Sequence, residues 1–566
     1  MAATFGWMKN YAKVIPCYVL LLAAAAAYGN DTTKIISVHS PAAPVKRYEK
    51  AEWRIALSAD YTNPYDQRQV MLDMHLVSPS GKPLLLPAYY DPEAHIWKSR
   101  FAPQETGQYR YYFELTAGGN TATSKQQSFT AQNTARKGFL HKNNLWTFRF
   151  DNGELFRGIG ENVAWESRSF ENDKWTYDYL LPSLARNGAN FFRTWMCYWN
   201  LPLEWQQPRS TKRYQPTDQY FHPGAIRRMD ELVQMCDSLQ LYFMLTLDWH
   251  GHLMEHGGWQ HSRYNTANGG PAATPTEFFT SRQAQEMYKN KLRYLVARWG
   301  YSTSIAVWEF FNEVDNAAFT RQDSILIPAS AITQWHLEMS RYLKDIDPYQ
   351  HLVSTSISHR DILGLNSIPY IDFNQKHIYK HTEKIPGIYP DYIQTYGKPY
   401  VVGEFGYRWE DQDPKYAQEA CYDYRRGLWY GMFSPTPILP MSWWWELFDD
   451  QHMTPYLRAA ATISNMMLKA GKGSFEQLPV RAAILESYAL RCGSSIFVYT
   501  LNNTGNPAPA NMSLPIPPGY SLQLFSPLKN TWQRRPYQVS ADGTVKVKDT
   551  SVPAKEALIL VFTPGP

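Results

Sequence analysis

One stretch of the chain points to its fold: Ile305-Ala306-Val307-Trp308-Glu309-Phe310-Phe311-Asn312-Glu313. Apart from Glu309 its first seven residues are apolar, and it has the length of a strand that is buried on both faces. Two polar residues, Asn312 and Glu313, follow at once. Strands of this kind are typical of parallel sheets covered by helices, so the stretch predicts an α/β fold with polar groups at a strand end.

The same pattern extends outward from this stretch, between residues 138 and 470. Short apolar segments alternate there with amphipathic ones. The expected strands are 156–160, 190–195, 242–247, 305–311, 351–356, 372–377, 400–405 and 438–445, with helices such as 224–239, 281–299 and 332–344 between them. Eight βα units close naturally into a ring, so we predict a (β/α)8 TIM barrel.

The regions on either side of the predicted barrel contain short strands separated by turn signals. With 566 residues the chain exceeds one ordinary core, so further domains are expected. We expect an N-terminal Ig-like β-sandwich over residues 30–137, the barrel over 138–470 and a C-terminal β-sandwich over 471–566.

Residues 1–29 have the features of a signal peptide. Lys9 and Lys13 precede a short apolar run, 14–27, with small residues near its end. We therefore expect a secreted or periplasmic protein that is not inserted in a membrane after signal cleavage. The remaining four cysteines are widely spaced, which indicates neither a disulfide framework nor a zinc site.

Composition favours one class of partner over others. The chain has 20 Trp and 39 Tyr, whose flat faces can stack on sugar rings. The net charge is +5, but the basic and acidic residues are interspersed without a Lys/Arg block. We therefore expect a carbohydrate partner and no nucleic acid.

Two of the predicted strands end in a glutamate: Glu313 follows 305–311 and Glu404 lies in 400–405. A single strand-end carboxylate is often part of a structural ion pair. Two that meet at the carboxyl face of a narrow barrel satisfy the requirement of a retaining glycosidase for two carboxyl groups about 5–5.5 Å apart. One would act as an ionised nucleophile, and the other would need a raised pKa to act as an acid.

The motifs around these glutamates resemble those of glycoside hydrolase family 5, of clan A. The resemblance rests on Trp308-Glu309-Phe310-Phe311-Asn312-Glu313 and Val402-Gly403-Glu404-Phe405-Gly406. It implies that Glu313 is the acid/base, that Glu404 is the nucleophile and that Asn312 hydrogen-bonds the sugar 2-hydroxyl.

Further motifs in the same order resemble those of the family. Arg193 is implied to orient the nucleophile by the motif Asn190-Phe191-Phe192-Arg193. His250 is implied to be an active-site residue by the motif Leu247-Asp248-Trp249-His250. His377 and Tyr379 are implied to lie beside Glu404 by the motif His377-Ile378-Tyr379.

The motif Ser442-Trp443-Trp444-Trp445-Glu446 implies a tryptophan that stacks on the substrate. The alignment favours Trp445, with Trp443 and Trp444 open to a register slip.

Three features are not settled by the motifs. The long segment 251–280 is expected to form one wall of the cleft. His250, His252 and His256 do not have the spacing of a standard ligand set, so neither a metal nor another cofactor is expected. Glu161 and Asn162 could line the cleft or cap a helix, with the second reading slightly favoured.

Together these observations predict a retaining glycoside hydrolase that cleaves β-glycosidic bonds in a poly- or oligosaccharide. Two alternatives stay open: a non-catalytic carbohydrate-binding barrel, and a transglycosylase that uses the same residues. The sugar, the linkage, endo or exo action and the oligomeric state are not determined by these motifs.

Overall fold

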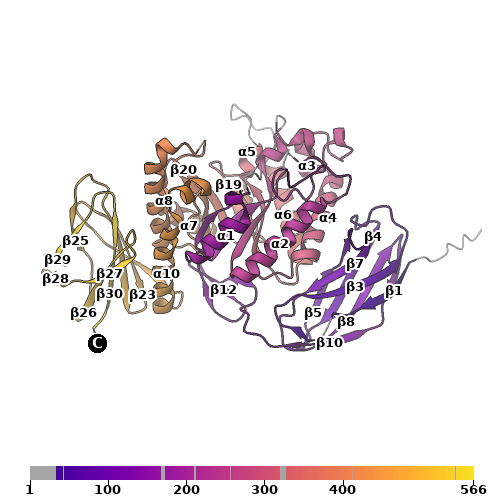
Figure 1. Cartoon of the computed structure of the whole chain (residues 1–566), viewed down its shortest axis with the longest axis horizontal. Helices are drawn as coiled ribbons and strands as arrows, with labels where there is room; N and C mark the ends of the chain where they lie inside the picture. Colours follow the sequence, from indigo (N-terminus) through magenta and orange to yellow (C-terminus); the bar gives the residue numbers. More distant parts are fainter. Residues whose placement is uncertain are drawn as a thin grey trace, which may run out of the picture.

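The computed structural model describes residues 33–565, except 42–43, 167–172, 209–211, 255–256, 319–326, 411 and 542. The predicted signal peptide, 1–29, therefore lies outside the described residues. A central body of parallel strands and helices is flanked by one β-rich domain near each end of the chain (Figure 1). Within the described residues no helix combines the length and apolarity needed to cross a bilayer.

The N-terminal domain consists of two sheets around one apolar core. The first sheet contains β1 (Lys34–His39), β3 (Ala51–Ser58), β7 (Ile96–Phe101) and β6 (Tyr89–Asp91). The second contains β2 (Val45–Lys46), β10 (Gln127–Gln132), β8 (Gly107–Ala117), β4 (Val70–Val77), β5 (Pro83–Pro87) and β9 (Asn120–Thr123). Alternate residues of β8 are buried, as expected for strands with one face on a core.

The central domain is a ring of parallel strands. In order around the ring they are β14 (Gly160–Asn162), β15 (Phe191–Trp195), β16 (Tyr242–Trp249), β17 (Ile305–Asn312), β18 (Leu352–Ser354) with β19 (Ser356–Ile357), β20 (Asn374–Tyr379) and β21 (Tyr400–Gly406). Residues 438–442 complete the ring, because they bond to Gly158 and Asn162 on one side and to β21 on the other. The described strands thus form a parallel barrel.

Helices cover the outside of this barrel (Figure 1). The α-helices are α1 (Tyr177–Arg186), α2 (Pro223–Leu239), α3 (Pro275–Thr280), α4 (Arg282–Trp299), α5 (Val314–Ala318), α6 (Ala329–Ile346), α7 (Ile385–Tyr396), α8 (Ala417–Met432), α9 (Trp445–Asp450) and α10 (Leu457–Gly471). The 3-10 helices are η1 (Asp173–Trp175), η2 (His250–Leu253), η3 (Trp259–His261), η4 (Thr266–Asn268), η5 (Leu365–Ser367), η6 (Thr382–Lys384), η7 (Pro414–Tyr416) and η8 (Thr454–Tyr456). Local signals set some boundaries: Ser281 caps α4 by accepting a hydrogen bond from the Ala284 N–H.

Two of the strand predictions are wrong, and each has a physical reason. Residues 438–445 form isolated bridges in place of a strand, because Pro437 and Pro440 lack the N–H groups that a ladder needs, and α9 begins at Trp445. The first barrel strand is Gly160–Asn162, later than predicted, because Phe156 belongs to a separate hairpin.

That hairpin closes the amino-terminal end of the barrel. It belongs to a three-stranded sheet of β11 (Leu140–Lys142), β12 (Phe148–Phe150) and β13 (Leu155–Phe156). Phe148, Phe150 and Phe156 share an apolar cluster with barrel residues from β15, β16, β17, β18 and β21. The barrel is therefore plugged at this end, and its polar groups can meet a ligand only at the other.

The C-terminal domain again has two sheets. One contains β22 (Phe475–Leu478), β23 (Glu486–Cys492), β24 (Ser495–Leu501), β30 (Ala557–Pro564), β26 (Tyr520–Ser526) and β27 (Thr531–Arg534), and the other contains β25 (Ala508–Ser513), β29 (Thr544–Val552) and β28 (Tyr537–Val539). Phe497 and Tyr499 of β24 belong to the same apolar cluster as the helices of the barrel. The larger sheet is thus packed directly on the central domain.

Candidate active site

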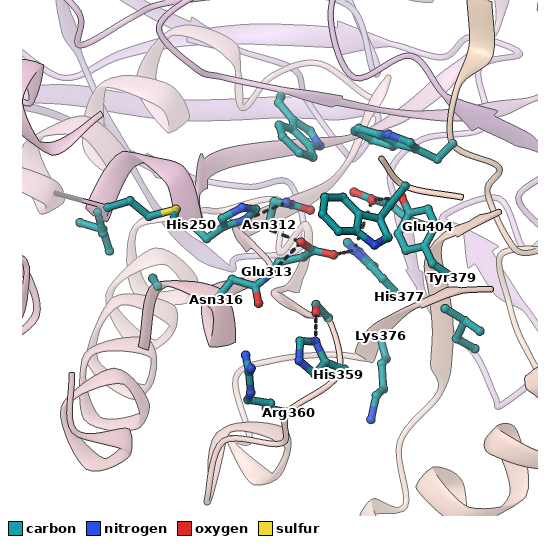
Figure 2. A pocket seen from close by; sticks show the side chains of 18 of the residues that line it. His250, Asn312, Glu313, Asn316, His359, Arg360, Lys376, His377, Tyr379 and Glu404 are labelled. Atoms are coloured by element: carbon teal, nitrogen blue, oxygen red, sulfur yellow. Dashed lines mark hydrogen bonds and ion pairs between the residues drawn. The ribbon is translucent and has the colours of Figure 1, made fainter. Parts of the chain in front are cut away.

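A cavity of about 1380 Å³ lies at the carboxyl ends of the barrel strands. Seven of the eight site residues expected from the sequence belong to this end of the barrel. Six of them line the cavity: His250, Asn312, Glu313, His377, Tyr379 and Glu404. Arg193 lies just beneath it and is fully buried. Figure 2 shows Glu313 and Glu404 on either side of His377, with His250 and Asn312 beside Glu313.

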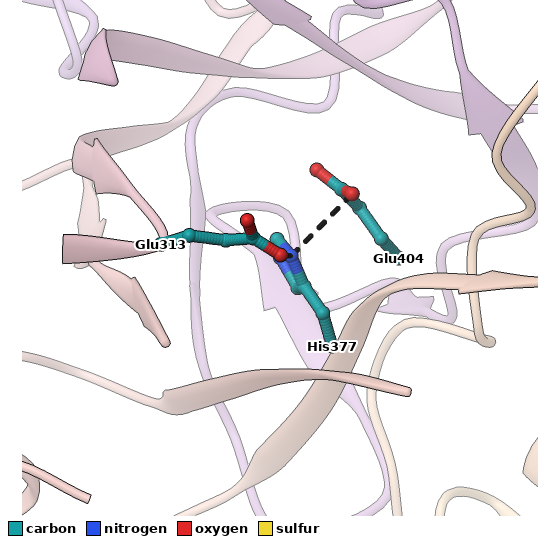
Figure 3. A group of neighbouring side chains, drawn as sticks. All are labelled: Glu313, His377 and Glu404. Carbon is teal, nitrogen blue, oxygen red and sulfur yellow. Dashed lines mark hydrogen bonds and ion pairs between the residues drawn. The ribbon is translucent and has the colours of Figure 1, made fainter. Parts of the chain in front are cut away.

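The two glutamates are close together. One carboxylate oxygen of Glu313, one ring nitrogen of His377 and one carboxylate oxygen of Glu404 all lie within 4.8 Å of one another (Figure 3). These three groups could hold a cation by distance alone, but the Arg193 guanidinium, which donates to Glu404 at 2.7 Å, already supplies a positive charge there. The spacing fits a pair of carboxylates that act on the same carbon atom.

Both carboxylate oxygens of Glu404 accept hydrogen bonds from fixed donors. Arg193 Nη1 donates to Oε1, and the Tyr379 hydroxyl donates to Oε2 at 2.5 Å. Burial raises the pKa of Glu404, while the neighbouring His377 and Arg193 act in the opposite direction. Donors fixed on both oxygens hold the carboxylate in one orientation.

Glu313 has no guanidinium partner. Burial raises its pKa, and His250, whose Nδ1 lies 3.7 Å from Oε2, opposes that rise. Asn316 Nδ2 donates to Oε2 at 2.9 Å, and His377 Nδ1 lies 2.9 Å from Oε1. A largely buried carboxyl without a guanidinium partner is suited to carry a proton.

The backbone at Glu313 is also unusual. Its φ is 51°, in the left-handed region that residues with a side chain rarely adopt. Its N–H donates to Ser356 Oγ of the next strand at 2.9 Å, which holds this conformation. Strain of this kind, fixed by a neighbouring strand, turns the side chain out of β17 into the cavity.

His377 is held as a neutral imidazole. Burial lowers its pKa to about 4, although Glu404 acts to raise it. Its Nδ1 lies 2.9 Å from Glu313 and 3.4 Å from Glu404. A neutral ring in this place can donate one hydrogen bond without adding a positive charge beside Glu404.

Arg193 depends on a residue to which the sequence analysis gave no role. Glu309 is fully buried and accepts two hydrogen bonds from the guanidinium, at 2.6 and 2.9 Å. Thr246 Oγ1 and Gln375 Nε2 each donate to Glu309 at 2.7 Å. The signal was present in the sequence as one charged residue inside an otherwise apolar strand, because such a charge requires a buried partner.

The expectation for Trp445 is corrected. Trp445 is fully buried at the start of α9 and packs on Trp165, away from the cavity. Trp443 lines the cavity instead, with Trp195 beside it at 5.3 Å between ring centroids. The reason is the left-handed φ of Trp444, 72°, which ends the extended segment one residue before Trp445.

Glu161 and Asn162 do not line the cavity and do not cap a helix. Both are buried, and Asn162 Nδ2 bonds to the carbonyls of Gly403, Met441 and Ser442, which ties strands on both sides of the ring closure together. Its Oδ1 accepts from Arg193 Nη1 at 3.2 Å. Asn162 therefore has a positioning role.

The segment 251–280 forms one wall of the cavity, as expected, through Leu253, Met254 and residues 274–276. Beneath this wall His252 Nδ1 lies 2.7 Å from Asp248 Oδ1, and His252 Nε2 lies 2.7 Å from Ser262 Oγ. This is the arrangement of a nucleophilic serine, but Ser262 is fully buried and outside the cavity lining. The three residues therefore anchor the loop. His256 lies outside the described residues.

Comparison with known proteins supports the same reading. A family model described as cellulase (glycosyl hydrolase family 5) matches residues 152–433, and one for a domain of unknown function (DUF5060) matches residues 44–116. The chain is 25% identical over 211 residues to a mannan endo-1,4-beta-mannosidase A of Podospora anserina, covering 33% of this chain and 52% of that protein. It is 29% identical over 132 residues to the enzyme of the same name of Aspergillus aculeatus, covering 23% and 30%. The chain thus spans about half the length, or less, of these curated relatives.

Solved structures share the fold. A glycoside hydrolase of Bacteroides vulgatus superposes with a TM-score of 0.65 at 14% identity, over 92% of this chain and 99% of that one. A family 5 glycoside hydrolase of the same species superposes with a TM-score of 0.51 at 14% identity, over 76% and 94%. At this identity the likeness concerns the fold alone.

Proposed function

Because residues 152–433 form a domain of glycoside hydrolase family 5, we propose that this chain is a retaining glycoside hydrolase that cleaves β-glycosidic bonds in a poly- or oligosaccharide. The observation that carries the proposal is the pair Glu313 and Glu404, with oxygens within 4.8 Å and different partners. Retaining enzymes need such a pair, one ionised and one protonated.

In the first step a carboxylate oxygen of Glu404 attacks the anomeric carbon. The bond from that carbon to the leaving oxygen breaks, and Glu313 gives its proton to this oxygen. The product is an ester between Glu404 and the sugar. Arg193 and Tyr379 keep the attacking carboxylate charged and oriented, and Asn312 is placed to bond the neighbouring 2-hydroxyl as charge develops.

In the second step Glu313, now ionised, takes a proton from water, and the hydroxide oxygen attacks the anomeric carbon. Glu404 leaves as a carboxylate, and the sugar regains its original configuration. The neutral His377, in contact with both carboxyl groups, supports the change in the charge of Glu313 between the two steps. Trp443 offers a flat face in the cavity for a sugar ring.

The wider organisation belongs to the same proposal. We assign a signal peptide to residues 1–29, an Ig-like β-sandwich to 30–137, a (β/α)8 barrel to 138–470 and a β-sandwich to 471–566. Export to the periplasm or the medium fits a polymeric substrate. Since the curated relatives are named as mannan endo-1,4-beta-mannosidases, β-1,4-mannan is the first polymer to test.

The test is product analysis by NMR on β-mannan, with β-glucan, xylan and galactan in parallel. We expect the β-anomer of the new reducing end to appear first, before mutarotation. Glu404→Ala and Glu313→Ala should each lower kcat by at least about 10³-fold. Initial formation of the α-anomer, or near wild-type turnover by either variant, would overturn the mechanism. Binding without turnover by the wild type would favour the carbohydrate-binding alternative, and larger products would favour transglycosylation.

A further inference from the structure

The charged residues that line the cavity are unevenly distributed. Apart from His250 and His377, which lie beside the two glutamates, the basic ones come from two neighbouring segments of the barrel rim, one after β19 and one from β20 to the end of η6. They are His359, Arg360, Lys376, Lys380, His381 and Lys384, which we call the basic wall. Among the described residues that line the cavity, the carboxylates are Glu313 and Glu404, the proposed catalytic pair. In Figure 2 His359, Arg360 and Lys376 lie together on the side of Glu313 that faces away from Glu404.

Two lysines of the basic wall have no acidic partner among the described residues: Lys376 and Lys384. The half-buried Lys376 is held in place by the Tyr392 hydroxyl, to which its Nζ donates at 2.9 Å. That hydroxyl donates in turn to Asp361 Oδ1 at 2.5 Å, so an acidic group reaches Lys376 only through Tyr392. Lys380, in contrast, already pairs with Glu410.

Lys384 faces the cavity from the junction of two helices. It ends η6 and precedes α7, whose first turn begins at Ile385, and Ile388 of the same turn also lines the cavity. The Ile385 N–H already donates to the Thr382 carbonyl and Pro386 has no N–H, so the positive charge at this point comes from the Lys384 side chain.

A neutral sugar gains less from such a wall, because its hydroxyl groups can accept hydrogen bonds from the lysines but carry no charge to pair with them. An anionic group gains a charge-assisted hydrogen bond, and the one-sided charge raises its local concentration in the cleft. Surface lysines in general are simply solvated, but these two flank one side of a cavity and have no acidic partner among the described residues.

We propose that the substrate is a glycan that bears an anionic group, a carboxylate or a sulfate ester, which binds against Lys376 and Lys384. This inference rests on the proposed glycosidase function and specifies its substrate class. The two anions share the chemistry of the contact and differ in shape, so the experiment treats them separately.

The experiment starts from the polymer that the enzyme hydrolyses best. One portion has its primary hydroxyls oxidised to carboxylates, part of that material is reduced back to the neutral polymer, and another portion is sulfated. The value of kcat/KM is measured on each at low and high salt. We expect at least about a tenfold preference for one anionic form over the reduced polymer, and we expect it to shrink as salt rises.

The double variant Lys376→Gln, Lys384→Gln should bring this preference close to one. The matched control is the double variant Lys529→Gln, Lys548→Gln, which removes the same charge from exposed sites on the C-terminal domain and should keep the preference. Binding of the carboxylated oligosaccharide to Glu404→Ala, measured by calorimetry, gives a readout that needs no turnover.

The outcomes separate the two proposals. No cleavage of any polymer by folded wild-type protein counts against the glycosidase function itself. Cleavage with equal kcat/KM on anionic and reduced polymers, or a preference that the Lys376→Gln, Lys384→Gln variant retains, overturns only the anionic substrate. A preference for the carboxylated over the sulfated polymer, or the reverse, identifies the anion.

Discussion

At the scale of single residues, the proposed roles of the two glutamates depend on which hydrogen-bond donors each of them has. Glu404 receives Arg193 and Tyr379, whereas Glu313 receives Asn316 and lies beside two histidines. Chemically equal side chains thereby have different hydrogen-bond partners, and the proposed mechanism requires opposite protonation states of them. The following two predictions test single side chains.

Tyr379→Phe should lower kcat by about 10- to 100-fold, because a hydrogen bond to a charged group is worth roughly 1.5–3 kcal/mol. The hydroxyl stabilises ionised Glu404, so its loss should raise the pKa of that carboxyl and move the acidic limb of the kcat/KM profile to higher pH. Tyr389→Phe, on α7 and outside the cavity lining, is the control. An unmoved acidic limb would contradict this role.

Glu161→Gln should leave stability nearly unchanged at pH 5 and raise the melting temperature at pH 9. Burial raises the pKa of Glu161 to about 8, with Asp449 and Glu446 adding to the rise. Between about pH 4.5 and 8 the folded state therefore binds more protons than the unfolded state. The free energy of unfolding of the wild type falls as pH rises through this range, until the folded pKa is passed. Calorimetry at both pH values measures the melting temperatures. Equal melting temperatures of variant and wild type at pH 9 would contradict a raised pKa of Glu161.

At the scale of elements, the loop 251–280 illustrates how a long connection becomes a fixed wall. Its conformation is fixed by hydrogen bonds among the buried Asp248, His252 and Ser262. A further bond joins Glu204 to the loop, because its carboxylate accepts from the Tyr264 hydroxyl at 2.8 Å. Hydrogen bonds that join buried polar groups in an apolar setting define one conformation well.

His252→Ala should weaken substrate binding more than it weakens the chemical step. Asp248 and Ser262 each lose one hydrogen bond and keep a backbone N–H donor. Each lost bond costs about 0.5–1.5 kcal/mol and loosens the wall that carries Leu253 and Met254. We expect KM to rise several-fold with a smaller change in kcat, and faster amide hydrogen exchange over 251–280. His261→Ala, an exposed histidine of the same loop, is the matched control. Unchanged exchange in the loop would refute the anchor.

At the scale of the whole molecule, the flanking domains are packed on the barrel and are joined to it by more than the chain connection. Arg100 and Arg298 both pair with Asp230, and Arg293 pairs with Asp73 at 2.5 Å. Tyr349 of the barrel domain belongs to the apolar core of the N-terminal domain, where its hydroxyl accepts from the Ala102 N–H at 3.0 Å.

Tyr349→Ala should therefore destabilise two domains at once. Removing a fully buried aromatic ring costs about 3–5 kcal/mol, and Tyr349→Phe, which removes only the hydroxyl, should cost about 1 kcal/mol. Differential scanning calorimetry should show one cooperative transition for the N-terminal domain and barrel in the wild type, lowered most by the alanine variant. Two separate transitions in the wild type would show that the domains unfold independently.

The sequence by itself determined much of this protein. The sequence predicts most barrel strands to within two or three residues, because the alternation of apolar strands and amphipathic helices is a local pattern. The family prediction is confirmed, because the βα topology places every strand end, and with it each motif, on one face of the barrel. The tertiary structure alone decided that Glu309 holds Arg193, that Trp443 faces the cavity in place of Trp445, that a hairpin plugs the barrel and that the basic residues gather on one wall. These contacts join segments far apart in the chain, and they depend on ring closure and on single backbone angles, such as that of Trp444, which no local pattern encodes.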